Sequence, residues 1–104
     1  MATTHRADAL FAPFQLRGEV DMATADELHA SLVAYAATSE GEVVCDCTDM
    51  DFLDSSGIAV LLDLYRELAQ LDRGIRLTNV SGPLHRVLEV TALLETFGVN
   101  EAPG

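Results

Sequence analysis

The sequence contains no lysine, and all six of its basic residues are arginine. Nucleotide hydrolysis of the P-loop kind requires a lysine that reaches the phosphates, so this class of enzyme is excluded. The 17 acidic residues outnumber the six basic ones and give a formal net charge of −11. Because nucleic-acid phosphates and anionic membrane surfaces repel such a charge, we expect no direct binding to nucleic acid or to a membrane.

Long apolar runs and cysteines are also scarce. No apolar run reaches the length of a membrane span, and the N-terminus lacks the apolar core of a signal peptide, so we predict a cytoplasmic protein. Cys45 and Cys47 lie one residue apart in a predicted strand, where their side chains share a face at a spacing poor for a disulfide. The three histidines have no zinc-like spacing with them, so we predict two core cysteines and no metal site.

Hydrophobic residues, by contrast, make up 49% of the chain, which argues against disorder. A length of 104 residues suits one domain, predicted over 1–104 with a frayed N-terminus at 1–9 and a tail at 100–104. Alternation or a short apolar run predicts strands at 14–20, 42–47, 75–80 and 95–99. Pro13 interrupts the apolar segment 10–12, so a further strand there is at most a stub.

Helical periodicity predicts three helices between these strands. The first runs from Thr24 to about Ala37 and opens with a capping box formed by Thr24 and Glu27. Its predicted buried residues are Leu28, Leu32 and Tyr35. The last helix opens at 81–83 and is predicted to be capped by Ser81 or Gly82. The apolar run at 42–47 suits a strand covered on both faces of a parallel sheet.

The middle helix belongs to a stretch, 51–62, around which the rest of the chain is organised. Ser55 or Ser56 is predicted to cap this helix by accepting a hydrogen bond from a backbone N–H of its first turn. Two hydroxyls then lie at the positive end of a helix dipole, where a phosphate is well placed. Asp49, Asp51 and Asp54 would make a phosphorylated tip densely negative. The predicted buried stripe consists of Ile58, Leu61, Leu62, Tyr65, Leu68 and Ala69.

Two features predict a docking surface for a partner protein. Val60 and Leu64 lie off the predicted stripe and would form a small apolar strip beside Ser55, unless the sheet or a neighbouring helix covers them. Loops at the carboxyl ends of parallel strands gather at one edge of a sheet. We expect that edge to hold Asp21, Met22, Asp54, Ser55, Ser56 and Gly57.

Catalysis is not predicted. A nucleophilic serine needs a base and an oxyanion hole, and no Gly-x-Ser-x-Gly elbow frames Ser55. His29 and His85 fall on predicted helices far from Ser55 along the chain. We therefore expect no enzyme and no cofactor, and an interaction module is the stronger class.

On local sequence alone, 54–57 is an ordinary turn and helix cap, but three blocks together resemble one family. Asp54-Ser55-Ser56-Gly57-Ile58, preceded by Phe52-Leu53, resembles the signature of STAS domains, specifically of anti-sigma factor antagonists. The block 18–28 is similar to that family's strand end and first helix, and 83–97 to its last helix and final strand. The resemblance implies an α/β fold, with a mixed, mainly parallel sheet of about four to five strands and helices packed against it.

The resemblance also implies a bacterial regulator of transcription that works by partner switching. Ser55 would be the phosphoacceptor, with Ser56 as the fallback. The unphosphorylated protein would bind an anti-sigma factor that is a serine kinase and so free the sigma factor. Phosphorylation would end this interaction, and a metal-dependent serine phosphatase would restore it. ATP and metal would belong to those partners, and this chain would be a monomer or weak dimer.

Two other roles of the same fold remain open. One is a scaffold in a stress-sensing assembly, and the other is an accessory subunit of a lipid transporter. The intact acidic-serine motif favours the antagonist over the transporter subunit, and the neighbouring genes would separate these roles.

Overall fold

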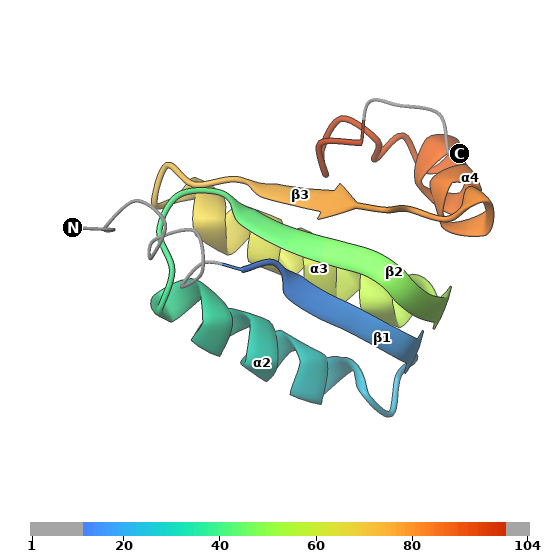
Figure 1. The fold of residues 1–104 in the computed structure, drawn as a ribbon, viewed down its shortest axis with the longest axis horizontal. Helices are drawn as coiled ribbons and strands as arrows, with labels where there is room; N and C mark the ends of the chain where they lie inside the picture. Colours follow the sequence, from blue (N-terminus) through green and yellow to red (C-terminus); the bar gives the residue numbers. More distant parts are fainter. Residues whose placement is uncertain (1–11, 100–104) are drawn as a thin grey trace.

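A computed structural model of the chain describes residues 12–99. Its elements follow the order β1 (Phe14–Val20), α2 (Ala25–Ala37), β2 (Val43–Leu53), α3 (Ser55–Ala69), β3 (Ile75–Thr78) and α4 (Gly82–Val90). The three strands form one sheet in the order β1-β2-β3, and both strand pairs are parallel (Figure 1). The predicted α/β class and parallel sheet are thus confirmed, with fewer strands in the described part of the chain than the four to five expected.

Some predictions concern residues beyond this part of the chain. The frayed N-terminus at 1–9, the tail at 100–104 and most of the possible strand stub at 10–12 lie outside the described residues. Ala12 is described and does not belong to a strand.

The core lies between the sheet and the two helices α2 and α3, which run side by side (Figure 1). Alternate residues of the strands face this core, as the buried Leu16 and Val20 of β1 show. On β2, Val43, Cys45 and Cys47 are buried, whereas the intervening Val44 and Asp46 are only half-buried. The prediction that 42–47 is fully covered on both faces is therefore wrong for the described residues, because the helices cover one face.

Both cysteines are free thiols in the core, which confirms the prediction for them. Burial raises the pKa of each thiol to about 12, since the thiolate would lose its hydration there. Both side chains therefore act as small apolar residues.

β2 is longer than predicted, because it runs on through the polar segment 48–51 to Leu53. β1 pairs with it along this extension as far as Val20↔Leu53, and two register shifts each leave one extra residue in β2. Hydrogen bonds with β1 thus hold the polar segment 48–51 in a strand, although its composition suggested a loop.

α3 is rotated relative to the predicted stripe. Its buried residues are Gly57, Val60, Leu61, Leu64 and Leu68. Tyr65 and Ala69, which were predicted to be buried, are exposed, whereas Val60 and Leu64 are 7% and 1% exposed. The exposed apolar strip predicted at Val60 and Leu64 is therefore wrong. α3 packs against α2 as well as the sheet, so its buried face points between the two.

The predicted strand at 95–99 is also wrong, because 95–98 form turns and Val99 belongs to neither a helix nor a strand. Phe97 and Val99 are nevertheless buried, and the Phe97 carbonyl accepts a hydrogen bond from the Leu77 N–H at 2.9 Å. The predicted cap of the last helix is correct: the Ser81 hydroxyl accepts a hydrogen bond from the Leu84 N–H at 3.3 Å.

Candidate functional site

The carboxyl ends of β1 and β2 lie side by side and bring two loops together. Val20 and Leu53 are register partners at the ends of these strands, and the Asp54 N–H donates to the Val20 carbonyl at 3.2 Å. Asp21 and Met22 follow β1 directly, and α3 begins directly after Asp54. The structure therefore brings 21–22 and 54–57 to one edge of the sheet, as predicted (Figure 1).

Asp54 caps α3, so the prediction that Ser55 or Ser56 is the cap is wrong. The Asp54 carboxylate oxygen Oδ1 accepts hydrogen bonds from the backbone N–H groups of Ser56 at 2.8 Å and Gly57 at 3.2 Å. Asp54 has the extended backbone of a cap residue, and Ser55 is already the first residue of the helix. A carboxylate in this position also complements the helix dipole.

The two serines of the motif differ in accessibility. Ser55 is exposed, and Ser56 is half-buried. Because Asp54 holds the N–H groups of Ser56 and Gly57, these groups are not free to receive a phosphate carried by Ser55. A modified Ser55 would lie in solvent beside a carboxylate.

Gly57 sets how closely α3 approaches the strands. A Cβ atom on this residue would lie 2.2 Å from Cδ1 of Leu53 and 2.9 Å from Cγ1 of Val20, both closer than atoms can pack. Leu53 and Val20 are themselves buried, so neither side chain has free space to move into. Glycine therefore lets the first turn of α3 rest on the strand ends and holds Ser55 at the edge.

Asp21 organises the other loop of this edge. Its carboxylate oxygen Oδ1 accepts hydrogen bonds from the N–H groups of Ala23 at 3.0 Å and Thr24 at 3.2 Å. Thr24 precedes α2 but makes no side-chain capping bond, so the predicted capping box of Thr24 and Glu27 is wrong. Met22 stands at the tip of the turn with 81% of its surface exposed. The edge thus combines one apolar side chain with a serine and two carboxylates.

Phe52 is a residue of this region that the sequence-based prediction of the docking surface did not include. It is 53% exposed and lies one residue before the buried Leu53. Phe52 and Leu53 are consecutive residues of β2 and point to opposite faces, so the burial of Leu53 leaves Phe52 exposed.

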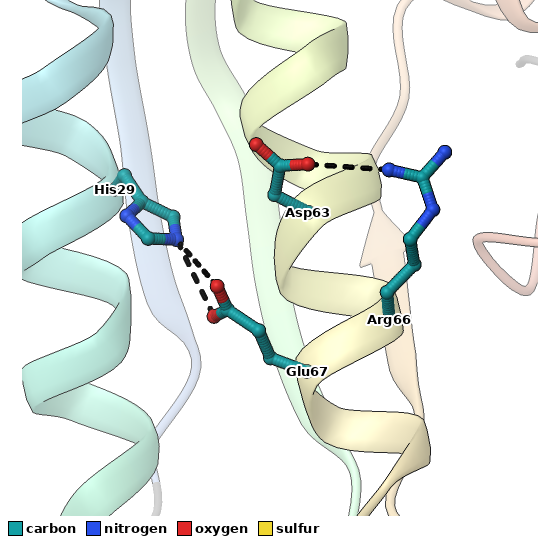
Figure 2. A network of polar contacts seen from close by, with 4 residues as sticks. All are labelled: His29, Asp63, Arg66 and Glu67. Atoms are coloured by element: carbon teal, nitrogen blue, oxygen red, sulfur yellow. Dashed lines mark hydrogen bonds and ion pairs between the residues drawn. The ribbon is translucent and has the colours of Figure 1, made fainter.

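A second set of polar contacts links α2 and α3 away from this edge (Figure 2). The His29 Nε2 atom of α2 lies 3.1 Å from Oε2 of Glu67 on α3. Within α3, Arg66 pairs with Asp63 at 3.2 Å. Glu67, Arg66 and Asp63 are exposed and His29 is partly exposed, so both pairs contribute little to stability. The contact between His29 and Glu67 also ties α2 to α3.

Within residues 12–99, no group of three or more histidine, cysteine or acidic side chains is arranged to hold a metal ion. No helix in the described part of the chain has both the length and the apolar composition needed to cross a membrane.

Proteins with curated names are similar to this chain over most of its length. Relatives include a Bordetella bronchiseptica protein named "Putative anti-sigma factor antagonist BtrV", 31% identical over 81% of this chain and 72% of its own length. Proteins named anti-sigma-B factor antagonist from Staphylococcus epidermidis and Staphylococcus aureus are 26% and 25% identical, each over 88% of this chain and 84% of their own length. The family model of the STAS domain matches residues 3–102, and the chain therefore belongs to the STAS domain family.

Proposed function

We propose that this STAS protein is an anti-sigma factor antagonist. In its unphosphorylated form it binds an anti-sigma factor that is also a serine kinase, and the sigma factor is released. Phosphorylation of Ser55 by that kinase ends the binding, and a serine phosphatase restores it. The protein acts as a cytoplasmic binding protein and not as an enzyme. Asp21, Met22, Asp54, Ser55, Ser56 and Gly57 form the docking edge.

The observation that carries this proposal is the position of Ser55. It is exposed at the start of α3, it is not needed as the helix cap, and it lies at the edge where Asp21 and Met22 also lie. A kinase can reach such a hydroxyl without unfolding the domain. The relatives are named as anti-sigma factor antagonists, and these names support the proposed function.

In this proposal the phosphate acts locally. A phosphoserine adds about −1.5 to −2 charges at pH 7. At Ser55 this charge stands beside the Asp54 carboxylate, which already holds the helix N–H groups. In solvent the repulsion is screened, so the fold tolerates it. A docked partner shaped for the neutral hydroxyl removes the water and leaves the phosphate unpaired, at a cost of several kcal/mol.

The first experiment maps the modified residue. The protein is incubated with its cognate anti-sigma factor kinase and ATP, and the product is mapped by mass spectrometry. We expect phosphate on Ser55, no modification of Ser55→Ala, and normal modification of the matched control Ser56→Ala. Phosphate on Ser56 in the parent protein would overturn the assignment of Ser55.

The second experiment separates binding from folding. Ser55→Glu is expected to lose binding to the kinase in calorimetric titration while its melting temperature stays within a few degrees of the parent. Met22→Ala should weaken binding as well, because the exposed Met22 side chain lies at the same edge. Full binding by Ser55→Glu, or loss of its native fold, would contradict the local action of the charge.

A further inference from the structure

β2 has a strand neighbour on each side, and the two neighbours pair with it over different lengths. β1 pairs with β2 as far as Leu53, whereas β3 pairs with it only from Val43↔Ile75 to Asp46↔Thr78. Among the described residues, 47–53 of β2 therefore have a strand neighbour on one side only. An open strand edge carries backbone N–H and C=O groups that an extended peptide from another chain can pair with.

A groove runs between this open edge and α4. Its walls are 50–53 of β2 on one side and Ser81, Pro83, Leu84 and Val87 on the other, and its volume is about 380 Å³. Most of these side chains are apolar, and the lining residue Phe52 is 53% exposed. The size falls at the lower end of the range for ligand pockets and suits a few side chains of a peptide.

The charge of the groove indicates what it binds. Asp51 is the one charged residue among those that line it, and its side chain is exposed. No arginine lines the groove, and three of the described arginines are engaged elsewhere. Arg66 pairs with Asp63, Arg76 pairs with Glu42, and Arg73 donates to the Ala36 and Gly41 carbonyls and the Ser39 hydroxyl. A peptide with basic residues is therefore attracted, and an acidic one is repelled.

We propose that the groove between β2 and α4 binds an extended segment of a partner protein with alternating apolar and basic side chains. The segment pairs with the open edge of β2 where β3 has ended, places apolar side chains beside Phe52 and Val87, and sets a basic residue against Asp51. Assignment of this segment to the anti-sigma factor kinase rests on the proposed function. The groove then extends the docking edge, because Leu53 is followed directly by Asp54 and Ser55.

The groove can be tested without the kinase. An acetylated and amidated hexapeptide of alternating arginine and valine is titrated into the ¹⁵N-labelled protein and followed by NMR. We expect amide shifts concentrated at 48–53 and 81–87, and slower hydrogen exchange at amides of 48–53. The same peptide with methylated backbone nitrogens should bind at least tenfold more weakly, because it cannot donate to a strand. A glutamate–valine hexapeptide should not bind.

Matched variants locate the binding. Val87→Arg places a cation in the groove and should weaken the binding of the arginine–valine peptide at least tenfold. Val90→Arg adds the same charge at a position of α4 that is 72% exposed and outside the groove. Val90→Arg should change the affinity less than twofold. If Val87→Arg does not fold, Asp51→Asn at an exposed position serves instead, with an expected loss of about two- to fivefold.

Several outcomes would overturn the proposal. These are absence of shifts at millimolar peptide, equal binding of the acidic or N-methylated peptide, or equal effects of Val87→Arg and Val90→Arg. Dimerisation that Val87→Arg abolishes in sedimentation would assign the groove to a second copy of this chain instead. A kinase complex lost in Ser55→Glu but unchanged in Val87→Arg would uphold the proposed function and reject the groove as part of its interface.

Discussion

The N-termini of α3 and α4 both contain a serine, yet the two serines have different tasks. At α4, the Ser81 hydroxyl is itself the cap and accepts the Leu84 N–H. At α3, the Asp54 carboxylate accepts two N–H groups, and the serine that follows it is exposed. A carboxylate cap thus leaves the neighbouring hydroxyl free for a modification that does not remove the cap.

The glycines of the same two first turns differ as well. Gly57 of α3 packs against Leu53 and Val20 so closely that a Cβ atom does not fit. At Gly82 of α4, no atom other than those of its own helix backbone and adjacent residues lies within 4 Å of the place where a Cβ would be. The glycine of α3 is in close contact with the strand ends, whereas the glycine of α4 has free space beside it. The start of α3 can hold a functional residue in a defined place, and three predictions test this contrast.

The largest effect is expected from adding one methyl group to each glycine. Gly57→Ala overpacks the contact with Leu53 and Val20 and should lower the free energy of unfolding by about 1–3 kcal/mol. Gly82→Ala, the matched control, should stay within about 0.5 kcal/mol of the parent or be slightly stabilising. Urea denaturation measures both. Equal free energies of unfolding for the two variants would show that Leu53 moves aside and that the start of α3 is not tightly packed against the strands.

The next effect concerns the caps. Asp54→Ala removes the acceptor of two N–H groups, and Ser81→Ala removes the acceptor of one. Each variant should lower the free energy of unfolding by about 0.5–2 kcal/mol, and the loss should be larger for Asp54→Ala. Asp54→Asn keeps an acceptor oxygen and should recover most of the loss. A larger loss of stability for Ser81→Ala than for Asp54→Ala in urea denaturation would contradict the expectation that the carboxylate is the stronger cap.

A smaller effect is expected at Ser55. Because this residue is exposed and is not the cap, Ser55→Ala should change the free energy of unfolding by less than about 0.5 kcal/mol. Ser81→Ala under the same conditions provides the scale. A loss at Ser55 as large as that at Ser81 would mean that the Ser55 hydroxyl also supports the helix start.

The smallest effect on stability is expected at Asp46, a carboxylate that lies away from the starts of both helices. The Thr48 hydroxyl and the Asn79 amide both donate to Asp46 and, with the Thr48 N–H, hold the pKa of this carboxyl at about 2. The folded pKa lies below the unfolded value of about 3.9. The contribution of Asp46 is therefore complete above about pH 5 and is lost as the pH falls towards 2.

Asp46→Asn tests this pH dependence. Its stability in urea should fall less steeply than that of the parent between pH 4 and pH 2.5, and the two should differ by a constant amount above pH 5. Parallel curves over the whole range would contradict the assignment of the lowered pKa to these hydrogen bonds.

Much of the fold follows from the sequence alone. The bounds of β1 agree with the prediction, and α2 ends at Ala37 as predicted. Ser81 caps the last helix, and the two cysteines lie in the core. These features depend on periodicity and on residues within a few positions of one another, so a short window of sequence contains the information. The gathering of 21–22 with 54–57 also follows, because parallel strands end at one edge.

Other features depend on contacts between distant parts of the chain, and only the tertiary structure decided them. β2 runs on to Leu53 because β1 supplies its hydrogen bonds. Val60 and Leu64 are buried because α2 lies beside α3. Asp54, Ser55 and Ser56 can all cap a helix, and the structure shows that Asp54 is the cap, with Gly57 in the same first turn packed on Val20 and Leu53. The groove at α4 exists because β3 ends at Thr78, and no local pattern determines where a strand loses its partner.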